Sequence, residues 1–133
     1  MRRCSCALFV RDGRFLLGRR SPADRLYPGV WDLIGGHAKP EETPEEALLR
    51  EVEEEIGSIP TEYSLLEIAP EPNPEANGPC EYHVFLVRGR AGPEPVVRNE
   101  EHVELGWFTL SEARGLKLAD PAYFELFARA SDI

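Results

Sequence analysis

The segment between Thr43 and Gly57 has residues typical of both ends of a single helix. Thr43 can cap a helix whose first position is Pro44, and Glu46 completes a capping box three residues after Thr43. Gly57 is typical of the residue that follows a helix end. The sequence therefore predicts a helix over residues 44–56, which the rest of the chain has to accommodate.

Apolar and acidic side chains occupy adjacent faces of this predicted helix. At about 100° per residue, one face gathers the apolar residues, which are Leu48, Leu49, Val52 and Ile56. The neighbouring face gathers Glu51, Glu54 and Glu55. Two full charges ~5 Å apart repel by roughly 3 kcal/mol at an effective dielectric constant of ~20. A divalent cation held between the carboxylates would offset this repulsion. Spacing alone equally allows a solvated acidic helix supported by ion pairs four residues apart.

Short apolar stretches around this helix have the composition of strands. They cover residues 4–10, 14–20, 30–34, 63–70, 80–88 and 103–110. Asp12-Gly13 predicts a hairpin turn between the first two, and the prolines of residues 71–79 predict a mobile loop. Asp120 and Pro121 predict the start of a C-terminal helix. Strands interleaved with two helices predict an α/β or α+β fold in one domain, residues 1–133, with helices covering a mixed sheet.

Charge and hydropathy narrow the classes of partner. The net charge is -9, and no Lys/Arg run suggests a track for a polynucleotide, whereas cation-neutralised small phosphorylated substrates remain compatible. No apolar stretch approaches the ~18 residues of a membrane helix, and the N-terminal apolar run is too short for a secretory signal. Cys4, Cys6 and Cys80 lack zinc-site spacing. We therefore expect a cytoplasmic protein with reduced, buried thiols and no membrane partner.

Residues 36–58 resemble the Nudix box, G-x5-E-x7-R-E-U-x-E-E-x-G-U, in which U is a bulky aliphatic residue. Eight of its nine specified positions match, namely Gly36, Glu42, Arg50, Glu51, Val52, Glu54, Glu55 and Gly57. Ser58 departs from the ninth, and Ile59 is an apolar candidate one step later. Ile34 stands where many members have proline, which leaves the geometry of that loop open.

The flanking segments LLGRRS, VWDLIGG and EEHVELGWFTLSE are also similar to small MutT-like Nudix hydrolases. The resemblance implies a Nudix-like α/β/α sandwich with a central mixed sheet and the family's loop-helix-loop. It also implies Mg²⁺ or Mn²⁺ as cofactor. The metal ligands carried over by position are Glu51, Glu54 and Glu55, which the carbonyl of Gly35 joins.

Two further acids and one arginine receive roles from their positions relative to the helix or from the same resemblance. Arg50 is expected to orient the carboxylates through charge-assisted hydrogen bonds, and Glu42 to stabilise the loop-helix-loop. Glu101 lies six positions before Trp107 and is the expected general base. Glu100 and Glu54 are the alternatives, and the sequence does not decide among the three.

The expected substrate contacts surround the two glycines. Arg20 ends a strand where relatives often contact phosphate, and an exposed arginine without a ligand is the alternative. His37 could touch phosphate or make a local hydrogen bond. Gly36, with Gly35, would leave room for phosphate oxygens or an unusual backbone angle, although a plain strand-end turn would also use glycine. Aromatic residues that could stack on a base or only pack are Tyr27, Trp31, Tyr82 and Phe85, near the loop of residues 70–79.

The leading expectation is a metal-dependent hydrolase in which water attacks phosphorus in a nucleoside diphosphate derivative, a nucleoside triphosphate above all. ADP-ribose and dinucleoside polyphosphates are alternatives within the same reaction. A non-catalytic nucleotide sensor is a second class, and a diphosphate isomerase of the same fold is a third. The complete set of box acids weighs against both, and no cysteine-centred catalytic pattern is evident.

Overall fold

The computed structural model describes residues 2–24, 27–98 and 102–131. Its strands are β1 (Arg2–Arg11), β2 (Arg14–Arg20), β3 (Trp31–Asp32), β4 (Ile34–His37), β5 (Ile59–Pro70), β6 (Cys80–Ala91) and β7 (His102–Phe108). Its helices are α1 (Pro44–Ile56), α2 (Pro74–Asn77), α3 (Leu110–Ala113) and α4 (Tyr123–Ser131). This is the mixed α+β architecture with a central mixed sheet that the sequence predicts.

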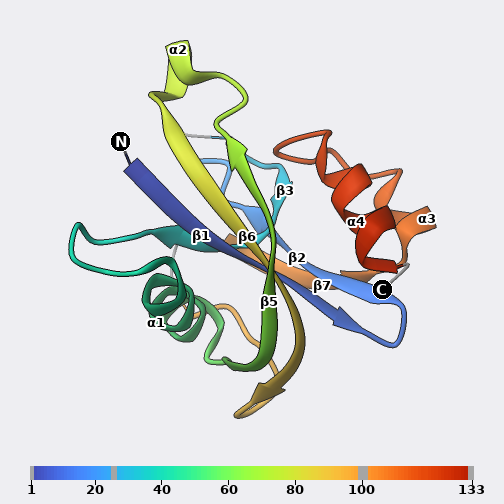
Figure 1. The fold of residues 1–133 in the computed structure, drawn as a ribbon. Helices are drawn as coiled ribbons and strands as arrows, with labels where there is room; N and C mark the ends of the chain where they lie inside the picture. The colour runs from blue at the N-terminus through green and yellow to red at the C-terminus, as the bar shows by residue number, and fades with distance from the viewer. Residues whose placement is uncertain (1, 25–26, 99–101, 132–133) are drawn as a thin grey trace.

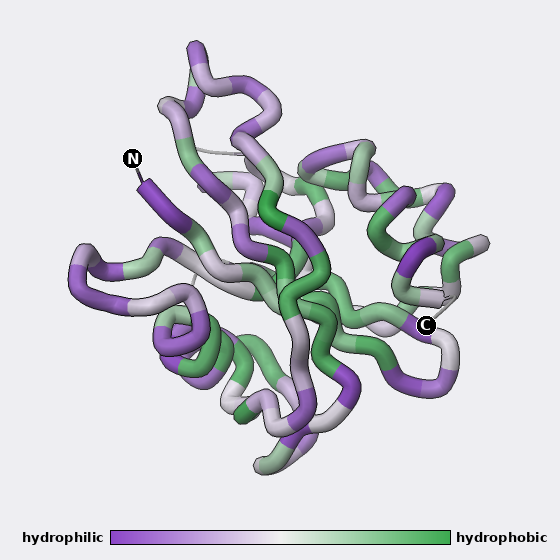
Figure 2. Tube along the Cα trace, in the orientation of Figure 1, coloured by the Kyte–Doolittle hydropathy of each residue, from purple (hydrophilic) through white to green (hydrophobic). Residues whose placement is uncertain are grey.

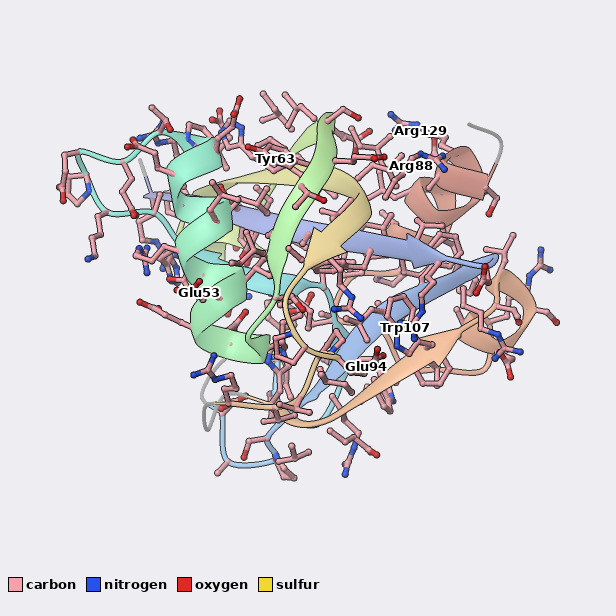
Figure 3. The ribbon with its side chains drawn as sticks, turned by 90° about the horizontal axis from the view of Figure 1, so that it is seen from below. Glu53, Tyr63, Arg88, Glu94, Trp107 and Arg129 are labelled. Atoms are coloured by element: carbon pink, nitrogen blue, oxygen red, sulfur yellow. The ribbon has the colours of Figure 1, made fainter. Side chains whose placement is uncertain are left out.

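The sheet runs in the order β3-β2-β1-β6-β5, with β4 also paired to β1 and β7 to β2. β1 and β6 are parallel, whereas the other pairs are antiparallel. At one edge of β1, β2 pairs with its end and β4 with its beginning. Figure 1 shows α1 on one side of the strands and α3 and α4 on the other. Figure 3 shows the same separation from below.

Alternation along the strands builds one core on each face of the sheet. Cys6 and Leu8 pack with Leu126 and Phe127 of α4. The intervening Ala7 belongs to a second core with residues of α1, which are Leu48, Val52 and Ile56. Apolar residues accordingly concentrate where the central strands cross in Figure 2, and hydrophilic residues gather at the turns. The second core therefore holds α1, with its acidic residues, against the side of the sheet where β1 pairs with β4.

The two local predictions with the strongest turn and cap signals are confirmed. Asp12 and Gly13 have φ values of 52° and 74°, as a type I′ hairpin turn requires. α1 spans the predicted residues, and the Thr43 hydroxyl accepts from the Glu46 N–H at 3.1 Å. Gly57 ends the helix in the left-handed region at φ 75°.

Other predicted elements differ in detail. The stretch 30–34 is not one strand, because β3 pairs with β2 and β4 with β1, and the chain changes partner at Leu33. The loop of residues 71–79 contains the single turn α2, capped by Asn73. The predicted strand 103–110 ends at Phe108, since a second capping box starts α3.

The C-terminal helix begins at Tyr123, two residues later than Pro121. The Asp120 carboxylate still accepts a hydrogen bond from the Ala122 N–H at 2.9 Å. As for membrane crossing, none of the helices in the described part of the chain has the length and apolar character that it demands.

Candidate active site

The acidic row of α1 passes from the protein interior to its surface. Glu55 is 1% exposed, the Glu51 side chain is 15% exposed and that of Glu54 is 57% exposed. The spacing of the helix places these three carboxylates on one side, as the sequence predicts. Only Glu54 therefore combines membership of the row with ready access to solvent.

Arg50 joins the acidic row to the loop before the helix. Its Nε and Nη2 donate to the two carboxylate oxygens of Glu42, at 2.7 and 2.8 Å. Its Nη1 donates to Glu51 at 2.9 Å and to Glu54 at 3.2 Å. Nη2 also reaches the carbonyl of His37 at 3.0 Å. The guanidinium thus fixes loop, helix and strand relative to one another through charge-assisted hydrogen bonds.

The contact with Arg50 lowers the pKa of Glu42. Hydrogen bonds from Arg50, and one from the Lys39 N–H, lower the pKa of Glu42 from 4.5 to about 2. The hydrogen bond with Glu42 is also the main cause that raises the pKa of Arg50, while burial opposes the rise. Glu42 and Arg50 therefore form a fixed ion pair over the whole physiological pH range.

Gly35 and Gly36 are required by close approach rather than by backbone angle. Both lie inside β4, opposite Cys6 and Ser5 of β1, and neither has a positive φ. A Cβ on Gly35 would lie 2.7 Å from the Cα of Cys6. A Cβ on Gly36 would meet the carboxylate of Glu51, with Oε1 at 2.9 Å. Two of the predicted alternatives, an unusual backbone angle and a strand-end turn, are therefore wrong.

The donor chemistry of the row fits a hard divalent cation, because carboxylate oxygens are the ligands that Mg²⁺ and Mn²⁺ take. Within residues 2–24, 27–98 and 102–131, however, no three His, Cys, Asp or Glu side chains already converge as a ligand set. Nη1 of Arg50 contacts one oxygen of Glu51 and one of Glu54. Convergence of the carboxylates on a cation would therefore need side-chain shifts around Arg50.

His102 lies beside the buried end of the row, a position to which the sequence assigns no role. Its Nδ1 is 3.8 Å from Oε1 of Glu55, and both side chains are almost fully buried. The imidazole packs on Gly18 of β2, where an added Cβ would lie 2.7 Å from Cδ2. The expected general base Glu101 and its neighbour Glu100 fall outside the described residues. His102 is the first residue of β7.

A cavity of about 120 Å³ adjoins the glycines on the α4 side of the sheet. It brings together the expected substrate contacts Arg20, Gly36 and His37, along with Gly35. Tyr27 and Tyr82 line it as predicted, and so do Pro70 and Pro72 of the predicted loop. Trp31 and Phe85 do not line it. Trp31 packs edge-on against Phe108, whereas Phe85 belongs to the core under α1.

Nothing in the sequence indicated that Asp32 would line this cavity. Asp32 accepts hydrogen bonds from the Tyr123 hydroxyl at 2.9 Å and from the Leu33 N–H at 2.8 Å. Arg20 has a nitrogen 3.9 Å from Asp32 and another 3.5 Å from Asp24. Tyr123 comes from α4, 91 residues away in the chain, so that no local pattern could have indicated the contact.

The thiols at the cavity are buried as predicted. Cys4 and Cys6 both line it, and Sγ of Cys4 lies 3.3 Å from Sγ of Cys80. Burial raises the pKa of Cys4, and the adjacent Cys80 raises it further. Burial also raises the pKa of Cys6 well above its usual value. Cys4 and Cys6 are therefore protonated at neutral pH and poor nucleophiles.

The chain belongs to the Nudix family, because the family model for the NUDIX domain matches residues 1–130. A MutT NUDIX hydrolase from Burkholderia pseudomallei has the same fold, with a TM-score of 0.83 and 31% identity over 98% of this chain and 95% of that one. Family and fold together support a Nudix pyrophosphohydrolase.

Two other similarities were found. An isopentenyl-diphosphate Delta-isomerase from Salmonella paratyphi B is 34% identical over 96% of this chain and 74% of its own length. The NUDIX domain of Shewanella oneidensis NrtR, solved with ADP ribose, aligns with a TM-score of 0.79 over 98% of this chain and 86% of that one. At 18% identity, the second similarity concerns the fold alone. The relatives thus span more than one chemistry on one fold.

Proposed function

We propose that this protein hydrolyses a diphosphate linkage in a nucleoside diphosphate derivative, with Mg²⁺ or Mn²⁺ bound by the α1 glutamates. A nucleoside triphosphate is the favoured substrate. The observation that carries the proposal is the acidic row Glu51, Glu54 and Glu55. Arg50 donates to the first two of these carboxylates, and Glu51 lies directly against Gly36. Nudix hydrolases generally use divalent metal ions, and this row has the oxygen donors that such ions take.

The chain's own residues would divide the work between α1 and the cavity. When bound, the cation would lower the pKa of an attacking water and stabilise charge on the phosphate oxygens. Glu51, Glu54 and Glu55 would hold it, with the Gly35 carbonyl as a further ligand. Arg50 would orient the first two carboxylates, since it already donates to both. Glu101 would take the proton from water, with Glu54 or Glu100 as the alternative base.

The cavity lies where the remainder of such a substrate could continue from the glycines. Arg20 and His37 would contact phosphate oxygens, and Gly36 would admit them close to the backbone. Three tyrosines line the same space, namely Tyr27, Tyr82 and Tyr123, and aromatic rings suit a planar base. ADP-ribose and dinucleoside polyphosphates remain alternatives for the same reaction. We retain the expectation of a cytoplasmic protein without a polynucleotide partner.

The Salmonella relative favours a second candidate, isomerisation of isopentenyl diphosphate. Cys4 and Cys6 line the cavity and would be the candidate groups for the proton transfers of that reaction. Their raised pKa values weigh against it, because such a thiol gives up its proton less readily and holds little thiolate to take one. Hydrolysis therefore stays the leading proposal.

One panel assay separates these functions. The purified protein is incubated with Mg²⁺ and the four deoxynucleoside triphosphates, ADP-ribose, a dinucleoside polyphosphate or isopentenyl diphosphate. Products are identified by chromatography and mass. We expect a nucleoside monophosphate with pyrophosphate from at least one triphosphate. Saturable binding without turnover, including with Mn²⁺ at alkaline pH, would indicate a sensor, and rearranged isopentenyl diphosphate would indicate an isomerase.

A further inference from the structure

A buried carboxylate outside the acidic row binds two of the tyrosines that line the cavity. Glu71 follows β5 and is 4% exposed. Its Oε2 accepts hydrogen bonds from the Tyr27 hydroxyl at 2.6 Å and from the Asn73 N–H at 2.8 Å. Its Oε1 accepts from the Tyr82 hydroxyl at 3.1 Å. Both tyrosines line the cavity, whereas Glu71 lies behind them and does not.

Tyr27 is held in a conformation that its own backbone does not favour. Its φ is 50°, and for a residue other than glycine such an angle costs on the order of 1–3 kcal/mol. The hydroxyl group is fixed twice, because it donates to Glu71 and accepts from Nδ2 of Asn77 at 3.1 Å. Contacts 44 and 50 residues away in the chain thus keep the ring at the cavity. Strain retained by a surrounding network is typical of functional sites.

The same segment is tied to the glycine strand. Arg2 donates to the carbonyl of Asn77 at 2.6 Å, and its other terminal nitrogen lies 3.1 Å from Nε2 of His37. His37 lines the cavity, and its carbonyl accepts from Arg50. A continuous set of contacts therefore runs from the tyrosine wall to the catalytic side of the proposed site.

We propose that Glu71 is a positioning residue for substrate binding, which holds Tyr27 and Tyr82 as a rigid aromatic wall against the base of the nucleotide. Each tyrosine has one hydroxyl proton, and both hydroxyl groups donate their hydrogen bond to Glu71. The wall therefore offers the ligand ring carbon rather than a hydrogen-bond donor. This inference rests on the proposed function, because it assigns the nucleotide base to this cavity.

Glu71 has to be ionised to accept all of these hydrogen bonds. Burial raises the pKa of Glu71, but hydrogen bonds from Asn73, Tyr27, Tyr82 and Asn77 outweigh burial and leave the pKa lowered. The carboxylate is therefore charged at neutral pH. Replacement by glutamine would keep the shape and put an N–H group where these partners need an acceptor.

Glu71→Gln tests the proposal, with Glu75→Gln as the matched control. Glu75 is an exposed acid of α2 in the same segment and does not line the cavity. With the triphosphate that gives the highest turnover, we expect KM to rise about tenfold in Glu71→Gln, the effect of losing about one net hydrogen bond. The kcat value should stay within about twofold, because Arg50 and the α1 glutamates are untouched. Glu75→Gln should match the wild type in both.

A second variant and a second readout keep the test independent of folding and catalysis. The double variant Tyr27→Phe, Tyr82→Phe retains Glu71 but loses both hydroxyl groups, and KM should rise in the same way. Calorimetry with dAMP, dCMP, dGMP and dTMP, without metal, reads the cavity directly, and we expect about tenfold weaker binding in both variants.

The outcomes separate the two proposals. A wild-type protein that cleaves nothing in the panel defeats the proposed function. Equal monophosphate affinity in wild type and the double variant defeats the role of Glu71, and so does a fall in kcat with unchanged KM. Absence of monophosphate binding to the wild type also overturns the inference, because the cavity would then hold no base.

Discussion

Arg50 grips Glu42 with two parallel hydrogen bonds, 2.7 and 2.8 Å long, across the turn that leads into α1. Glu42 stands before the helix and Arg50 two turns inside it, so that the pair closes the loop onto the helix that it precedes. The same guanidinium reaches two carboxylates of the acidic row. Formation of the loop and orientation of the proposed metal ligands therefore depend on one side chain.

The Glu42 contact predicts a pH dependence of stability. The pKa of Glu42 is lowered to about 2 in the folded protein, below the usual 4.5 of the unfolded chain. The stabilisation is therefore present above about pH 4.5 and is lost as pH falls towards 2. Thermal unfolding of wild type and Glu42→Gln from pH 7 to pH 2.5 should show a large difference that shrinks through this window.

Glu41→Gln is the control for that titration, because Glu41 is the neighbouring acid and is exposed. Its unfolding curve should run parallel to that of the wild type at every pH. A constant gap between wild type and Glu42→Gln down to pH 2.5 would contradict the ion pair.

Glu54→Gln should lower turnover by orders of magnitude and leave the fold intact, since its side chain is 57% exposed and its loss removes repulsion within the row. The matched control is Glu53→Gln, because Glu53 is also exposed on α1, where Figure 3 labels it. Steady-state kinetics and thermal unfolding of both variants check this. Equal activity in the two variants would remove Glu54 from the catalytic assignment.

Substitution of the two glycines of β4 should have different effects, one on stability and the other on turnover. Gly35→Ala would drive a Cβ into the backbone of β1, so we expect a loss of stability of at least about 3 kcal/mol or failure to fold. Gly36→Ala would instead meet the end of the flexible Glu51 side chain. It should cost about 1 kcal/mol or less and reduce turnover sharply, because Glu51 has to move. Urea unfolding and kinetics distinguish these outcomes, and the reverse ranking would refute the geometric reason.

Ser58 predicts a stabilising substitution. It is fully buried, whereas Ile59 is 43% exposed, so Ser58 occupies the interior place and the apolar role expected for Ile59 is wrong. Among the described residues, its hydroxyl has no hydrogen-bond partner. Ser58→Ala should raise the free energy of unfolding by about 1 kcal/mol. A lower stability in urea unfolding would show that the hydroxyl is bonded.

Local signals explain why α1 and the turn of the first hairpin could be predicted to the residue. The Thr43 cap, Glu46 and Gly57 all lie within one helix, and Asp12-Gly13 forms its turn without help from elsewhere. The break at Leu33 could not be predicted, because the residues before it pair with one strand and the residues after it with another. Strand pairing of this kind is a property of the whole sheet.

The same distinction holds within the candidate site. The carboxylate row and its contact with Arg50 could be predicted from the motif and from helical spacing, whereas several contacts between different elements could not. Glu42 meets Arg50 across a turn, and Glu71 meets Tyr27 from 44 residues away. Charge and aromatic content alone gave no sign that Glu71 holds two cavity tyrosines. The long-range contacts supply what the motif lacks, namely the shape of the space beside the phosphate site.

Electron paramagnetic resonance of Mn²⁺ measures the central claim most directly, because it counts free metal without requiring turnover. Wild-type protein, with or without nucleotide, should remove the free Mn²⁺ signal saturably, whereas Glu51→Gln and Glu54→Gln should leave more Mn²⁺ free at equal concentration and Glu53→Gln should match the wild type. An undiminished free signal with the wild type, or uptake unchanged by both substitutions, would contradict the assignment of this row as the metal site.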